Sequence, residues 1–98
     1  MTSKDYVVSE DLLRLVAYIQ TSTYRLKVLK SMDGNFITPT AIGKATDLRT
    51  NHVSSVLSEL KEKNLVECIN DDVRKGRIYK TTDLGKDVIN CINQGIIK

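Results

Sequence analysis

Four of the fifteen basic residues in this 98-residue chain fall within the seven positions 74–80. Arg74, Lys75 and Arg77 lie on either side of Gly76, a residue that favours a turn. A cationic turn of this kind can lie along a phosphate backbone or enter a narrow minor groove. Runs of charge are also common in solvated turns, and that alternative remains open.

Small polar side chains share one face of a helix that the sequence predicts over residues 50–63. They are Asn51, Ser55 and Ser58, with Glu62 on the same face and His52, Ser54 and Glu59 on its flanks. Such side chains let a backbone come close to a partner, and they offer donors and acceptors to the edges of DNA bases. An asparagine amide pairs well with adenine when it makes two hydrogen bonds. The alternative is an ordinary solvated helix face.

Phosphate contacts are expected where the predicted helices begin and turn, because backbone N–H groups are exposed there. The residues at these places are Thr40, Lys44, Arg49 and Thr50. Asp71 and Asp72 precede the cationic turn and would repel phosphates. We therefore expect these two acids to face away from a duplex or to pair with neighbouring cations.

The sequence gives little support for a catalytic or a metal-binding role. His52 is the only histidine, and the serines near it have no recognisable base and orienting acid. Cys68 and Cys91 are too few and too far apart for a zinc pattern or a disulfide framework, so they are expected to be buried thiols. The sequence predicts no metal, no cofactor and no enzyme active site.

Composition predicts a single domain over residues 1–98, because a chain of this length can build only one core. The hydrophobic share is 41% and the aromatic share 5%, so the core should be aliphatic. The net charge of +3 is modest and does not by itself indicate a partner. A polar start and the lack of an apolar run of about 18 residues favour a soluble, cytoplasmic protein without membrane association.

The first predicted helix covers residues 9–20 and begins at Ser9. Its apolar residues span a wider sector than one stripe: Leu12, Leu13, Leu15, Val16, Ala17 and Ile19. A helix of this kind must cover a core and a further surface, which indicates a dimer contact.

A second helix is predicted over residues 24–32, ended by the turn-forming sequence at 33–35. Residues 38–63 then predict a helix-turn-helix. Its short first helix starts at Thr38-Pro39 and should bury Ala41, Ile42 and Ala45. The longer second helix should bury the residues of one stripe, namely Val53, Val56, Leu57 and Leu60.

Two extended runs, 65–70 and 77–81, predict a β-hairpin over residues 65–81. The last predicted helix covers residues 82–95 and starts at Thr82. Its apolar stripe comprises Leu84, Val88, Ile89, Ile92 and Ile96.

This order of elements predicts an α+β, mainly α fold, a winged helix-turn-helix with a two-stranded wing and extra N- and C-terminal helices. In such a fold the longer helix can enter the major groove of double-stranded DNA while the wing 74–77 contacts the backbone or the minor groove. The sequence thus predicts a DNA-binding regulator, a homodimer through its N- and C-terminal helices. The alternative is a protein-interaction module, since Glu59, Glu62 and Glu67 place acids near the longer helix.

The central part of the chain, Tyr24 to Val88, resembles archaeal winged helix-turn-helix transcriptional regulators, relatives of the multiple-antibiotic-resistance and arsenic-resistance repressors. The segments that carry the resemblance are YRLKVLKSM, TPTAIGKATDL and HVSSVLSELKEKNLVECINDDVRKGRIYKTTDLGKDV.

The resemblance implies a recognition helix that includes 52–58, a wing at 75–77 and dimerisation through helices outside the central motif. It also implies that Tyr79, Thr82 and Gly85 form the junction with the final helix. The chain departs from the family at Asn64, where glycine is usual, and at Leu84, where a charged residue is common.

Overall fold

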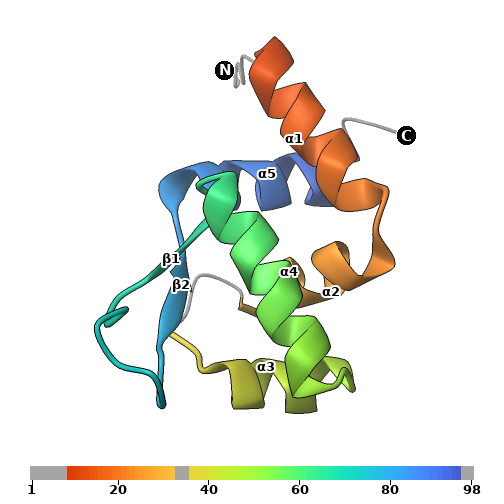
Figure 1. Cartoon of the computed structure of the whole chain (residues 1–98). Helices are drawn as coiled ribbons and strands as arrows, with labels where there is room; N and C mark the ends of the chain where they lie inside the picture. Colours follow the sequence, from red (N-terminus) through yellow and green to blue (C-terminus); the bar gives the residue numbers. More distant parts are fainter. Residues whose placement is uncertain (1–8, 33–35, 96–98) are drawn as a thin grey trace.

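The computed structural model describes residues 9–32 and 36–95, and these contain five helices and one two-stranded sheet (Figure 1). The predicted turn at 33–35 and the predicted apolar residue Ile96 lie outside the described residues. The elements are α1 (Glu10–Gln20), α2 (Thr23–Met32), α3 (Pro39–Thr46), α4 (Thr50–Glu62), β1 (Val66–Cys68), β2 (Tyr79–Thr81) and α5 (Asp83–Asn93). Within these ranges no helix is long and apolar enough to cross a membrane.

Three predicted helix caps are confirmed. The side chains of Ser9, Thr38 and Thr82 each accept a hydrogen bond from the backbone N–H three residues later, at 3.1, 3.2 and 3.0 Å. Asn64, which follows the last residues of α4, has φ 63°, a left-handed conformation that asparagine tolerates. Local capping chemistry therefore sets where these helices begin and end.

The predicted inward face of α3 is wrong at two of its three positions. Ala41 and Ala45 are exposed, and the buried residues are Ile42, Gly43 and Thr46. A threonine can be buried in a helix when its hydroxyl bonds to the preceding turn, and its polar type does not reveal this. The Thr46 hydroxyl does so, donating to the Ile42 carbonyl at 2.7 Å.

The core is a single aliphatic cluster between the helices and the inner face of the sheet. Each helix contributes to it, α4 through the predicted residues Val53, Val56, Leu57 and Leu60. Helices α1 and α5 pack against each other, and Figure 1 shows α1 reaching beyond the rest of the molecule at this end. The expectation of an aliphatic core is thus confirmed.

The sheet pairs β1 with β2 in antiparallel register, with Glu67 opposite Lys80. A third short segment joins it, because Ile37 and Tyr79 exchange two backbone hydrogen bonds of 2.9 Å. This contact, which the sequence analysis did not predict, ties the start of α3 to the base of the wing.

Both strands are shorter than predicted, because the side chain of Asn70 replaces part of the backbone ladder. Its Oδ1 atom accepts from the Ile78 N–H at 2.8 Å, and its Nδ2 atom donates to the Gly76 carbonyl at 3.1 Å. Beyond this point the chain forms a loop, and Gly76 has φ 72°, a conformation that favours glycine. The tip of the wing is therefore a loop closed by an asparagine side chain.

The junction between wing and α5 is tightly packed around Gly85. A Cβ atom at this position would clash with the Leu65 carbonyl oxygen and lie 2.6 Å from Cγ2 of Thr81. The Thr82 hydroxyl also donates to the Asn64 carbonyl at 2.6 Å. These contacts fix the wing against the end of α4.

Candidate nucleic-acid interface

The exposed side of α4 and the wing enclose an open cleft of about 470 Å³. Seven of the predicted site residues line it: Thr40, Thr50, Ser54, Ser58, Arg74, Lys75 and Arg77. They come from three segments that are separated in the sequence, α3, α4 and the wing. The fold therefore gathers small hydroxyl groups along one wall and three cationic side chains along the other.

The three remaining predicted residues of α4 lie outside this cleft. Asn51 and Ser55 are exposed on the side of α4 opposite its buried stripe. His52 is exposed as well, and its ring stacks on that of Tyr24 at the start of α2. The polar face of α4 thus extends from the wing on one flank to α2 on the other.

Lys44 and Arg49 are exposed and do not line the cleft. Lys44 is in the last turn of α3, and Arg49 is the residue that precedes the first turn of α4. The Arg49 side chain makes no capping hydrogen bond. The first N–H groups of α4 therefore have no acceptor from this side chain, which leaves them available to an anion.

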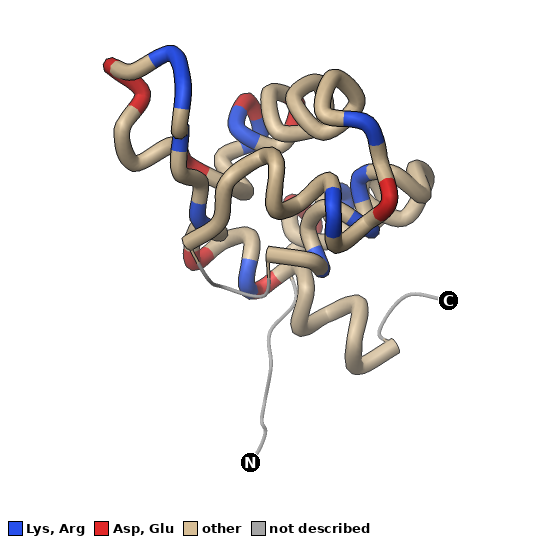
Figure 2. The backbone as a smooth tube through the Cα atoms, turned by 90° about the horizontal axis from the view of Figure 1, so that it is seen from below, with Lys and Arg blue, Asp and Glu red and all other residues tan. Residues whose placement is uncertain are grey.

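Two cations at the tip of the wing, Arg74 and Lys75, are exposed, and neither takes part in an ion pair within the described part of the chain. Arg77 is half-buried, and its Nε atom donates to the Val73 carbonyl at 2.7 Å. This bond orients the guanidinium while its other nitrogens stay available. Figure 2 shows the wing loop projecting from the body, with its basic and acidic residues on separate stretches.

The expectation that the acids before the cationic turn pair with neighbouring cations is met in part. Asp71 lies 3.7 Å from the ammonium of Lys61, so it pairs with a cation, although that cation belongs to α4 and not to the wing. Glu67 similarly lies 3.9 Å from Lys80 across the sheet. Both contacts are exposed and contribute little to stability, but they draw carboxylates toward cations of the protein.

Several residues of this surface were missed in the sequence analysis. Thr38, Pro39 and Tyr79 line the cleft because the pairing of Ile37 with β2 brings the start of α3 beside the wing. Tyr24 is 46% exposed and reaches the surface through its stack on His52. Its sequence signal is weak, since an aromatic residue at the start of a helix usually belongs to the core.

Comparison with known proteins identifies the fold. No family model matches the sequence, and no curated protein matches it significantly. Among solved structures, a TubR protein bound to 24 bp of tubC from Bacillus thuringiensis serovar israelensis is 18% identical, with a TM-score of 0.74 over 91% of this chain and 97% of that chain. A mutant of the type III plasmid segregation protein TubR is 16% identical, with a TM-score of 0.75 over 95% and 100%.

A MarR-family transcription regulator is 18% identical, with a TM-score of 0.71 over 87% of this chain, which spans 58% of that regulator. At these identities the likeness establishes the fold. The chain has the predicted α+β winged-helix architecture, and the resemblance to winged-helix regulators is supported at that level.

Proposed function

We propose that this chain is a transcriptional regulator that binds double-stranded DNA in a sequence-specific manner. One observation carries the proposal: hydroxyl side chains of α3 and α4 and cations of the wing line a single open cleft. A concave surface with one polar wall and one cationic wall suits a groove bordered by phosphates. The fold is also that of a protein bound to a 24 bp duplex and of a MarR-family transcription regulator.

In this proposal α4 enters the major groove, which at about 12 Å is wide enough to admit a helix. Asn51 and Ser55 face the base edges, because they lie opposite the stripe that anchors α4 in the core. Arg74 and Lys75 follow the phosphate backbone or enter the adjacent minor groove. Sequence preference thus comes from α4, and general affinity comes from the wing.

Phosphates at the edge of the groove are held by the start of α4. Thr50 is exposed, the Arg49 side chain makes no capping hydrogen bond to this first turn, and the positive end of the helix dipole favours an anion there. Arg49 and Lys44 add positive charge beside this end, and Thr40 adds a hydroxyl from the first turn of α3. These contacts orient the helix without reading the sequence.

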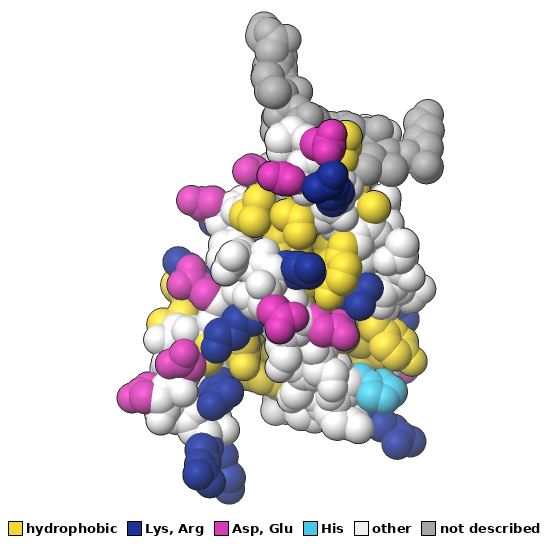
Figure 3. Space-filling model, turned by 45° about the horizontal axis from the view of Figure 1, so that its top comes forward, with side chains coloured by type: hydrophobic (Ala, Val, Ile, Leu, Met, Phe, Trp, Pro, Cys, Tyr) yellow, Lys and Arg dark blue, Asp and Glu magenta, His cyan; other side chains and the backbone are white. Residues whose placement is uncertain are grey.

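The protein acts as a homodimer through α1 and α5. Leu13 and Leu15 of α1 and Ile89 and Ile92 of α5 are only half-buried, and the two helices pack together at one end of the molecule. Figure 3 shows hydrophobic side chains gathered toward this end and dark blue cations at the tip of the wing, well away from it. Such a dimer presents two copies of α4 to half-sites about 34 Å apart, one turn of the duplex.

Selection of bound duplexes from a random library tests the proposal. The expected result is an enriched motif with two related half-sites, together with a dimer in sedimentation experiments. Leu13→Glu is expected to yield a monomer that binds single half-sites weakly. A library that shows no enrichment at low salt would overturn the proposal. If the protein instead captures a stable protein partner, the alternative of a protein-interaction module is favoured.

A second candidate function is DNA binding in plasmid segregation. It is supported by the structural likeness to TubR proteins, one of them solved with tubC and matched over 91% of this chain. Mapping the bound sites in cells separates the two. Sites at promoters with altered transcripts after deletion support a regulator, whereas loss of an inherited plasmid without altered transcripts supports segregation.

A further inference from the structure

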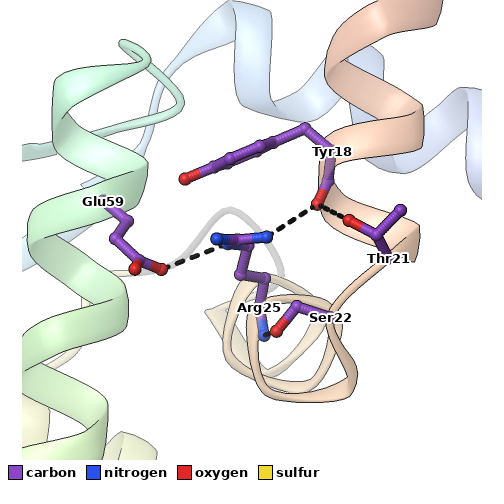
Figure 4. Close-up of polar contacts among 5 residues, drawn as sticks. All are labelled: Tyr18, Thr21, Ser22, Arg25 and Glu59. Atoms are coloured by element: carbon purple, nitrogen blue, oxygen red, sulfur yellow. Dashed lines mark hydrogen bonds and ion pairs between the residues drawn. The ribbon is translucent and has the colours of Figure 1, made fainter.

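The side chain of Arg25 joins three helices at a point away from the cleft (Figure 4). Its Nε atom lies 3.1 Å from Oε1 of Glu59 on α4, and its Nη1 atom donates to the Tyr18 carbonyl on α1 at 3.2 Å. The guanidinium also lies over the Tyr18 ring, 3.9 Å from its centroid. Among the described residues this is the only ion pair that connects two helices.

The geometry uses properties that lysine does not have. A planar guanidinium can stack on an aromatic ring while its edge donates in two directions. The Tyr18 carbonyl is in the last turn of α1, where carbonyl groups have no partner within the helix and the helix dipole is negative. Arg25 donates to that carbonyl, which also accepts from the Thr21 hydroxyl at 2.9 Å, and at the same time faces a carboxylate. Its side chain is 21% exposed, so it is held largely inside the molecule.

Glu59 is an acid on a flank of the helix that we propose to enter the groove. It follows His52 by seven residues, which places it on the same side of α4 and about 10 Å further along the axis. Its side chain is 45% exposed. An unpaired carboxylate here would repel the phosphates that border the groove, at a distance where screening by salt is incomplete.

We propose that Arg25 is a positioning residue for DNA binding, which neutralises the Glu59 carboxylate and holds it against the end of α1, away from the phosphates. Arg25 does not contact the duplex in this account, because its donors are directed at Glu59 and α1. The inference rests on the proposed function. It explains how α4 carries Glu59 beside a surface that attracts phosphates, and it does not extend to Glu62, which is exposed in the last turn of the same helix.

Three variants of the full chain, with a fourth as control, test this inference by their affinity for a duplex selected as described under the proposed function. Arg25→Ala is expected to weaken binding about threefold to tenfold at low salt, because it leaves Glu59 unpaired. Glu59→Gln is expected to bind at least as tightly as the unaltered protein. The double variant Arg25→Ala/Glu59→Gln is expected to return to within about twofold of the unaltered protein, since the repelling charge is gone.

The matched control is Arg14→Ala. Arg14 also pairs with carboxylates, Glu10 at 2.7 Å and Asp11 at 3.7 Å, but at the far end of α1 and with 72% of its side chain exposed. The same loss of charge there is expected to leave affinity within about twofold, since exposed charges far from the groove are screened, and sedimentation of this variant checks that the dimer through α1 is kept. Thermal unfolding of each variant reports whether the fold is kept.

Salt provides the second measurement. The loss in Arg25→Ala is expected to shrink at high salt, because screening weakens repulsion between a carboxylate and phosphates. An equal loss in Arg25→Ala and in the double variant, or a loss independent of salt, would overturn the inference in favour of a packing role. Unchanged affinity of Arg25→Ala would overturn it as well. Absence of duplex binding by the unaltered protein would instead overturn the proposed function, and this inference with it.

Discussion

The imidazole of His52 stacks on the ring of Tyr24, with ring centroids 5.4 Å apart and an interplanar angle of 29°. The two residues belong to different helices, α4 and α2, and both are exposed. The stack orients the imidazole on the flank of α4 that faces away from the wing. It extends the candidate DNA surface onto α2, which contributes none of the predicted contacts.

Removing the Tyr24 ring should weaken DNA binding. We expect Tyr24→Ala to lower the affinity for the selected duplex about threefold to tenfold, because an unsupported His52 side chain loses its fixed orientation. Tyr24→Phe keeps the ring and is the matched control, with affinity expected within about twofold. Titrations of the selected duplex with the unaltered protein, Tyr24→Ala and Tyr24→Phe measure the three affinities. Equal affinity of all three would exclude a role for the stack.

The wing should contribute affinity that does not depend on sequence. The double variant Arg74→Ala/Lys75→Ala is expected to weaken binding to selected and random duplexes alike and to reduce the slope of log affinity against log salt by about 1.8 per subunit of the dimer. Lys86→Ala, an exposed lysine on α5, serves as the control and should leave the slope unchanged. A loss confined to the selected sequence would contradict this assignment.

Asn51 and Ser55 should contribute preference among sequences. We expect Asn51→Ala to reduce discrimination between the selected duplex and one with altered half-sites by about fivefold to a hundredfold, the range for one bidentate base contact. Affinity for random duplexes should change by less than about twofold. Competition titrations measure both quantities, and retained discrimination would show that Asn51 does not contact a base.

Thr81 offers a test of the fold that is independent of DNA. Its side chain is buried at the end of β2, and its hydroxyl has no hydrogen-bond partner in the structure. Thr81→Val removes this hydroxyl and keeps the shape, so we expect the free energy of unfolding to rise by about 1 kcal/mol and the melting temperature by about 4–8 °C. Calorimetry measures both, and a lower melting temperature would show that the hydroxyl is satisfied in solution.

Features fixed by neighbouring residues could be predicted from the sequence. Ser9, Thr38 and Thr82 cap their helices through N–H groups three residues away, and Asn64 ends α4 by its own backbone preference. The stripe on α4 was predicted for the same reason, because a helical period places its residues on one face.

Features that depend on distant parts of the chain could not be predicted. The bridge between Ile37 and Tyr79, which brings Thr38 to the cleft, joins residues about forty positions apart. The Arg25–Glu59 pair depends on how α2 packs against α4. Ala41 and Ala45 were predicted to be buried and are exposed. Small apolar residues occur on either side of a helix, so their type does not reveal burial.

The salt dependence of duplex binding by the unaltered protein tests the central claim most directly. A dimer that neutralises about four to six phosphates should show log affinity falling with log salt at a slope of about −4 to −5. Binding to the selected duplex with such a slope is the result that this account predicts. No binding at low salt, or binding whose affinity is independent of salt, would contradict it.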